Sequence, residues 1–151
     1  MNKSTKYSKV LFILHMPPPV HGASMVGKYI HDSKIINNAF ECHYLNLALA
    51  KDLDDIGKGG IRKLKEFYKQ LKQIRKQTKL IVPQLCYVTP NAKGGAFYKD
   101  FFVVMLLKMM RQNIVVHYHN KGIATRQNRY FDNLLYLSLI HISEPTRQEA
   151  I

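Results

Sequence analysis

The sequence predicts a single α/β domain built on a parallel β-sheet. The apolar run KVLFILHM at residues 9–16 is continuous and stops at three prolines, as expected of a short strand buried on both faces. Further strand-like runs alternate along the 151-residue chain with segments of helical periodicity. Such alternation is typical of parallel strands joined by right-handed helical crossovers. We therefore expect a Rossmann-like parallel sheet with flanking helices.

The hydrophobic pattern places four strands and three helices. We expect strands at residues 9–16, 40–47, 85–91 and 113–120, and helices at residues 23–37, 60–80 and 96–110. Ser24 is a possible N-cap of the first helix. In the second helix one apolar stripe is expected to face the core; its members are Ile61, Leu64, Phe67, Tyr68, Leu71 and Ile74. The third helix is apolar nearly all round and is expected to pack against the sheet.

The formal net charge of +13 implies attraction to an anionic partner, which can be nucleic acid, anionic lipid or a phosphorylated substrate. No apolar run approaches the length of a membrane span. The first apolar run is too short for a signal peptide, so a cytoplasmic location is expected. Cys42 and Cys86 lie in strand-like runs without CxxC or zinc spacing, which favours reduced core cysteines.

The last fifteen positions continue neither a helical stripe nor a strand pattern. Leu137–Arg147 reads LSLIHISEPTR, which matches the in-frame translation of a common transposase sequencing adapter. A genuine C-terminal tail is the alternative. We interpret residues 137–151 as a non-biological, adapter-derived tail and residues 1–136 as a partial domain, and we expect the natural protein to be longer.

Three of the expected strands end in loops suited to ligand binding. The first is followed by PPPVHGAS, the third by TPNAKGGA and the fourth by HYHNKG. Ligands of open parallel sheets bind beyond the carboxyl ends of the strands, so these loops are expected to converge on one site. In the first loop Gly22 permits close backbone approach at a helix N-terminus, although a stiff turn without a ligand is the alternative. The dinucleotide fingerprint GxGxxG is absent, which disfavours a dehydrogenase.

The fourth strand carries two histidines, His117 and His119, whose side chains would share one face of the sheet if the strand extends that far. A metal pair lacks an evident third ligand, because Asp100 is expected inside a helix and Asp132 after a polar stretch. We expect no metal. His119 is expected to face the cleft as a donor or weak base, with Asn120 and Lys121 extending the same edge.

The second expected helix is strongly basic. Two interpretations are open: the basic side chains form an ordinary solvated helix face, or they form a surface that rests on an anionic membrane. Nucleic acid is not expected as a partner, because no stacking motif or reader module is present. The residues expected to face the membrane are Arg62, Lys65, Lys69, Lys72 and Lys76.

The chain resembles the N-terminal half of a bacterial glycosyltransferase. Four segments carry the resemblance by their order: the first strand, its proline loop, HGASMVGKYI and HYHNKG. The family has the GT-B fold and belongs to the retaining group called family 4. The resemblance covers about residues 8–136. PPPVHGAS resembles the family's glycine loop, with one glycine where many relatives have two, and VVHYHNKG resembles its fourth-strand segment, which ends in a functional histidine.

The resemblance implies an enzyme of two Rossmann-like domains that transfers a sugar from a nucleotide-sugar to a glycan or lipid-linked acceptor in the cell envelope. It implies peripheral association with the inner face of the plasma membrane and no cofactor. It also implies that His119 is catalytic. The residues implied to bind substrate are His21, Gly22, Ala23, Ser24, His117, Asn120 and Lys121.

This chain stops before the domain that would bind most of the nucleotide-sugar, so the 151-residue chain itself is expected to be inactive. The alternative reading is a basic, non-enzymatic α/β module that binds nucleic acid or an anionic membrane.

Overall fold

The structure, a computed structural model, describes residues 8–18, 20–47, 61–91 and 95–118, with side chains from residue 64 onward in the third range. The elements of this part follow one another as β1 (Lys9–Leu14), α1 (Gly22–Asp32), α2 (Lys34–Ala39), β2 (Glu41–Asn46), α3 (Ile61–Ile81), β3 (Leu85–Val88), α4 (Gly95–Met109) and β4 (Ile114–Val116). The expected α/β class is confirmed.

The four strands form one parallel sheet in the order β2-β1-β3-β4. β1 is a central strand and pairs with β2 on one side and with β3 on the other. The chain leaves β1 toward β2 and leaves β3 in the opposite direction, toward β4. The sheet therefore has a topological switch point between the carboxyl ends of β1 and β3, which is where open α/β sheets bind ligands.

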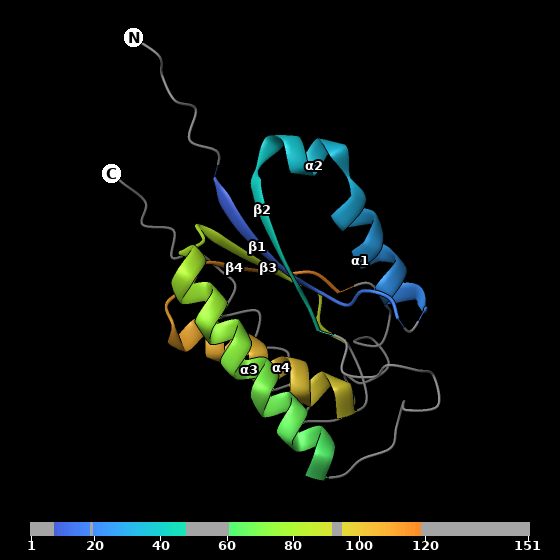
Figure 1. The fold of residues 1–151 in the computed structure, drawn as a ribbon, viewed down its shortest axis with the longest axis vertical. Coiled ribbons are helices and arrows are strands. Elements are labelled where there is room, and N and C mark those ends of the chain that lie inside the picture. The colour runs from blue at the N-terminus through green and yellow to red at the C-terminus, as the bar shows by residue number, and fades with distance from the viewer. Residues whose placement is uncertain (1–7, 19, 48–60, 92–94, 119–151) are drawn as a thin grey trace, which may run out of the picture.

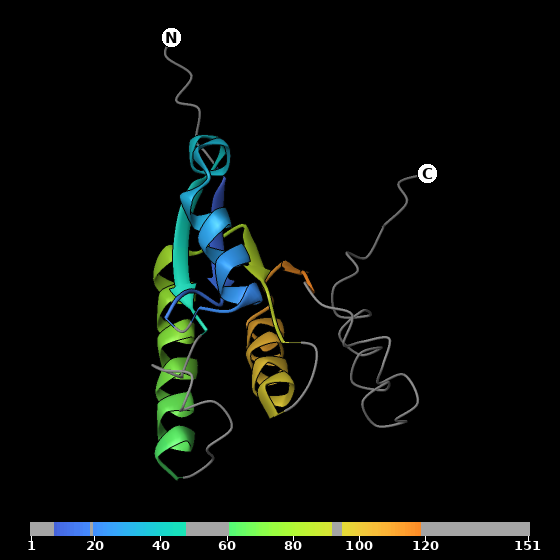
Figure 2. The ribbon, with the colours of Figure 1, turned by 90° about the vertical axis from the view of Figure 1, so that its right-hand side faces the viewer.

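The helices cover the sheet on both sides, with α1 and α2 on one face and α3 and α4 on the other (Figures 1 and 2). Side chains of β1 alternate between these faces, because successive residues of a strand point in opposite directions. Leu11 and Ile13 are fully buried in the cluster with α3 and α4. Val10, Phe12 and Leu14 form the smaller cluster with α1 and α2. This double burial explains why the run at 9–16 is apolar without alternation.

The helix expected at residues 23–37 is two helices. α1 ends at Asp32, and Ser33 caps α2 by accepting a hydrogen bond from the backbone N–H of Ile36 at 3.4 Å. Ser24 is not the N-cap of α1. That position is held by His21, while Ser24 lies one turn inside the helix and is fully buried.

The expected stripe of α3 is only partly correct. Ile74 is buried and Phe67 and Leu71 are half-buried, but Leu64 and Tyr68 are 68% and 69% exposed. The buried arc continues instead through Gln70 and Thr78, two polar residues whose side chains donate hydrogen bonds to backbone carbonyls, at 3.0 Å to Asn46 and at 2.8 Å to Ile74. Hydrogen bonds to backbone carbonyls thus allow these polar residues to occupy positions that hydropathy alone assigns to the surface.

Helix α4 is buried on one side only, although its sequence is apolar nearly all round. Phe97, Val103 and Leu107 are fully buried against the sheet and α3. Phe102 and Met109 are 57% and 76% exposed. The expected packing against the sheet is confirmed.

Both cysteines are free, as expected, with Cys86 buried in β3 and Cys42 half-buried in β2. Burial raises the pKa of the Cys86 thiol to about 12, because the thiolate would lose its hydration in the core.

Helix α1 lies unusually close to the end of β1 at Gly27. A Cβ atom on Gly27 would stand 2.0 Å from the carbonyl oxygen of His15 and 3.4 Å from Cβ of Leu14. No side chain fits in that space without moving the helix. At Gly22, the first residue of α1, a Cβ would meet no atom within 4 Å. The glycine required for close packing is therefore Gly27, which the sequence reading did not single out.

We expect Gly27→Ala to lower the free energy of unfolding by about 1–3 kcal/mol, the usual cost of forcing atoms into a packed interior. Urea denaturation followed by circular dichroism measures this change. Gly22→Ala is the matched control and should be close to neutral, because the added methyl group has open space. Equal effects of the two substitutions would contradict the close contact at Gly27.

Candidate functional site

The candidate site lies at the switch point, where His15 follows β1 and Asn91 follows β3. Both side chains turn toward Asp100, which projects from the first turns of α4. Asp100 is fully buried and His15 is 4% exposed. A buried carboxylate is costly unless donors surround it, so the arrangement of its partners decides whether it is stable.

Three donor groups converge on one oxygen of the Asp100 carboxylate. Its Oδ2 atom is 2.9 Å from the backbone nitrogen of Asn91, 2.9 Å from Nδ2 of Asn91 and 3.1 Å from Nε2 of His15. Asn91 Nδ2 is also 2.9 Å from His15 Nε2, so these three side-chain atoms form a closed triangle. We call His15, Asn91, Lys99 and Asp100 the strand-end cluster.

Lys99 completes the strand-end cluster and extends it to β2. Its ammonium group is 3.0 Å from Oδ1 of Asp100 and donates to the carbonyl of Leu47, the residue after β2, at 2.9 Å. Burial alone would raise the pKa of Asp100. The hydrogen bond from His15, the charge of Lys99 and the backbone N–H of Asn91 outweigh burial and lower that pKa below its ordinary value.

The cluster therefore ties three strand ends to a single carboxylate. His15 belongs to the end of β1, Leu47 to the end of β2 and Asn91 to the end of β3. Charge-assisted hydrogen bonds of this kind are about twice as strong as neutral ones, so they define the relative positions of the loops that follow the strands.

His21 closes the N-terminus of α1 through a reciprocal pair of hydrogen bonds with Ser24. Its Nδ1 atom accepts from the backbone N–H of Ser24 at 3.3 Å, and Ser24 Oγ accepts from the backbone N–H of His21 at 2.9 Å. The Ser24 hydroxyl also lies 2.9 Å from the carbonyl oxygen of His21, to which it donates. Ser24 is thus committed to the cap of the helix, whereas Gly22 is exposed and Ala23 is half-buried.

The proline loop between β1 and α1 is also held at its beginning. Asn46, the last residue of β2, accepts from the backbone N–H of Met16 at 3.1 Å and donates to the Met16 carbonyl at 3.2 Å. Its side-chain amide thereby replaces the next rung of the β1–β2 ladder. Within the loop, the peptide bond between Pro17 and Pro18 is cis.

The fourth strand ends earlier than expected, at Val116. His117 therefore lies just beyond the strand, is exposed and hydrogen-bonds through Nδ1 to the hydroxyl of Tyr87 in β3. The described part of the chain ends at Tyr118, so the predictions for His119, Asn120 and Lys121 fall outside it. Of the predicted site residues, the structure describes His21, Gly22, Ala23, Ser24 and His117.

Sequence reasoning missed the strand-end cluster. The sequence pattern suggests Asp100 only as a metal ligand, a role that its expected position inside a helix disfavours, and it places His15 in an apolar strand. A signal was present, since an aspartate within an otherwise apolar helix needs a buried partner. Within the residues that the structure describes, no group of three or more His, Cys, Asp or Glu side chains is placed to hold a metal ion.

Comparison of the chain with protein-family models, with curated proteins and with solved structures finds no match. The switch-point edge of the site carries a half-buried imidazole, the N-terminus of α1 and an exposed glycine above a buried ionic cluster. Such an edge can bind a polar or anionic group by hydrogen bonding.

We expect Asp100→Asn to lower the free energy of unfolding by about 3–5 kcal/mol, because it leaves the half-buried Lys99 and the buried His15 without their anionic partner. Because the folded-state pKa of Asp100 is lowered, the stability from its carboxylate is fully present above its ordinary pKa of 3.8 and is lost as pH falls through the lowered pKa. Thermal unfolding at pH 7 measures the loss. Asp32→Asn removes an exposed carboxylate and is the control; a similar loss there would argue against the cluster's role.

Proposed function

We propose that this chain is the N-terminal, acceptor-side domain of a GT-B glycosyltransferase of the retaining family 4, and that the whole enzyme transfers a sugar from a nucleotide-sugar to a glycan or lipid-linked acceptor. The observation that carries the proposal is the position of the loop PPPVHGAS. It leaves the central strand β1 at the switch point and delivers His21 and Gly22 to the N-terminus of α1.

The geometry of that loop supports a role in binding a sugar or its phosphate. It is anchored at both ends, by Asn46 and by the cap of α1, and Gly22 has open space around it. A loop fixed in this way can present backbone N–H groups to a ligand without being ordered at the moment of binding, which lowers the entropic cost of binding. The cluster behind it holds the neighbouring strand ends in register.

The enzyme proposal is tested on the protein encoded by the uninterrupted gene. The reading frame is followed beyond codon 136 in genomic DNA, and the purified product is assayed for release of nucleoside diphosphate from UDP-, GDP- and ADP-sugars. We expect a second Rossmann-like half and measurable turnover. His119→Ala should lower kcat/KM by roughly 10²-fold or more, the usual contribution of a positioned acid or base.

His31→Ala is the control, because His31 is exposed in the last turn of α1, at the far end of that helix from the site. It should retain full turnover. A reading frame that stops soon after Tyr136, or a full-length product without any transfer from these donors, would exclude the glycosyltransferase.

A second property, binding to an anionic membrane, is favoured by the surface of α3. Lys65, Lys69, Lys72 and Lys76 are all exposed and lie on the side of the helix opposite its buried arc. Of Arg62, expected in the same row, only the backbone is described. Among the described residues, no helix is long and apolar enough to cross a membrane.

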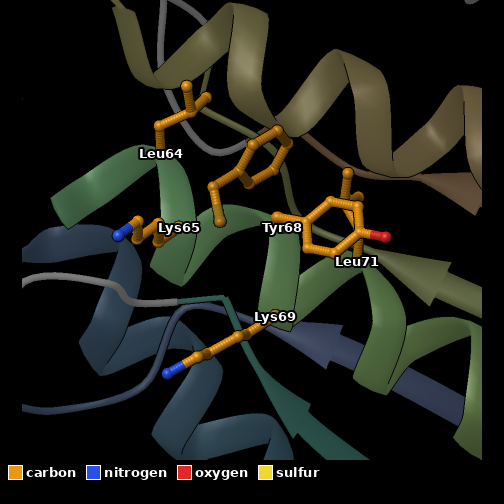
Figure 3. A pocket seen from close by; sticks show the side chains of 6 residues that line it. Leu64, Lys65, Tyr68, Lys69 and Leu71 are labelled. Atoms are coloured by element: carbon orange, nitrogen blue, oxygen red, sulfur yellow. The ribbon is translucent and has the colours of Figure 1, made fainter. Parts of the chain in front are cut away.

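Apolar side chains adjoin this row of lysines. Leu64, Phe67, Tyr68 and Leu71 line an open hollow of about 590 Å³ whose margin includes Lys65 and Lys69. Figure 3 shows Lys65 and Lys69 pointing away from Tyr68 and Leu71. Apolar side chains next to cationic ones suit the boundary between lipid headgroups and acyl chains. An ordinary solvated helix face would not need Leu64 and Tyr68 in these exposed positions.

We expect the chain to cosediment with vesicles that contain phosphatidylserine and not with vesicles of phosphatidylcholine alone. Lys69→Gln with Lys72→Gln should weaken binding about 30-fold, at about 1 kcal/mol for each basic residue near the headgroups. Lys28→Gln with Lys34→Gln, on the helices of the opposite sheet face, removes the same charge and should matter much less. Equal losses, or stronger binding to DNA than to vesicles, would reject a membrane surface on α3.

A further inference from the structure

The proline loop is flanked by two histidines that face one another. His15 precedes the loop and His21 follows it, and their ring centroids are 6.3 Å apart with 57° between the ring planes. His15 is almost fully buried and His21 is half-buried. At this separation a positive charge on one imidazole disfavours a positive charge on the other.

The cap of α1 determines which nitrogen of His21 carries a proton. Nδ1 of His21 accepts the backbone N–H of Ser24, so it must have a free lone pair. A neutral imidazole whose Nδ1 accepts carries its proton on Nε2. His21 therefore has an N–H group to offer at the edge of the sheet, and protonation of Nδ1 would break the cap.

The strand-end cluster determines whether Nε2 of His15 carries a proton. Nε2 of His15 is 3.1 Å from a carboxylate oxygen of Asp100 that is completely buried. An unprotonated Nε2 would accept from Asn91 and would then bring its lone pair against the lone pairs of that anion. A protonated Nε2 donates to the carboxylate instead, and the Asn91 amide donates to the same oxygen. The second arrangement satisfies the buried charge and is the favoured one.

The charged groups around the two rings come from three parts of the fold. Asp100 and Lys99 project from α4, the polar Asn91 follows β3, and His15 and His21 face each other across the loop. The Asp100 carboxylate lies against His15 and not against His21. At His21 an added proton would have to displace the backbone hydrogen bond of the cap.

We propose that the cap of α1, together with the neighbouring ring of His15, keeps His21 a neutral imidazole with its proton on Nε2, so that His21 meets a ligand as a hydrogen-bond donor and not as a base. The placement of protons rests on the hydrogen bonds that the two rings make with Ser24 and Asp100. Only the arrival of a sugar or phosphate oxygen at His21 rests on the proposed function.

The electrostatics of His21 agree with this assignment. Burial, and then the nearby charge of His15, lower the pKa of His21 below its ordinary value of 6.5. Because the folded-state pKa is lowered, the unfolded chain takes up a proton at His21 first as pH falls. The contribution of the cap to stability is therefore fully present above about pH 6.5 and is lost as pH falls through the folded-state pKa.

The proton positions are measured on the 151-residue chain by long-range ¹H–¹⁵N NMR of the imidazoles. At pH 7.5 we expect His21 to show a protonated Nε2 and an unprotonated Nδ1. In His15→Gln, which keeps an amide donor for Asp100 but removes the imidazole next to His21, the pKa of His21 should rise toward 6.5. Asp32→Asn is the control, since it removes the partner of His31 and should leave His21 unchanged.

A His21 protonated on Nδ1 would overturn the proposal. So would an unchanged pKa of His21 in a His15→Gln protein whose amide spectrum is otherwise native. If His15→Gln does not fold, His21→Asn supplies the test, because Asn caps helices well and does not titrate.

In His21→Asn the loss of stability between pH 7 and pH 5 should be smaller than in the unsubstituted chain, and an equal loss would refute the inference. None of these measurements involves sugar transfer, so failure of the glycosyltransferase proposal would leave them unaffected.

Discussion

The carboxylate of Asp100 is the constraint on which the organisation of the sheet edge depends. It is completely buried, and ionised groups are tolerated in such places only when donors surround them. Here the donors come from the segments after β1 and β3 and from Lys99, which in turn holds the end of β2. Satisfying one anion therefore brings three strand ends into a defined arrangement, and the loops that leave them inherit it.

The hydrophobic pattern was sufficient for the architecture. Strands β1 to β4 and helices α3 and α4 lie close to the ranges that periodicity predicts, although β4 ends early at Val116, because burial on two faces of a sheet requires apolar side chains at known intervals. The predictions are wrong at positions where polar residues shape a helix or occupy its buried side. Ser33 divides the first helix by capping its second half, and Gln70 and Thr78 occupy the buried arc of α3.

The candidate site was predictable only in its position. The carboxyl ends of parallel strands converge, so the importance of the loop at 17–24 followed from fold class. Its interior did not, because His15 and Asp100 are 85 residues apart and no local pattern links them. The role of His21 as the N-cap was equally hidden, since histidine is not among the residues preferred there. Contacts between polar side chains that are far apart in the sequence leave no periodic pattern, so hydropathy cannot reveal them.

The two anchors of the proline loop have a consequence for how this protein can diversify. Asn46 fixes the chain at Met16, and the His21–Ser24 cap fixes it again five residues later. Neither anchor uses the side chains of Pro18 and Val20, which are exposed between them, so these two positions can be exchanged with little effect on the sheet or on α1. Evolution, or a designer, can therefore vary what this edge of the fold recognises while inheriting an intact scaffold.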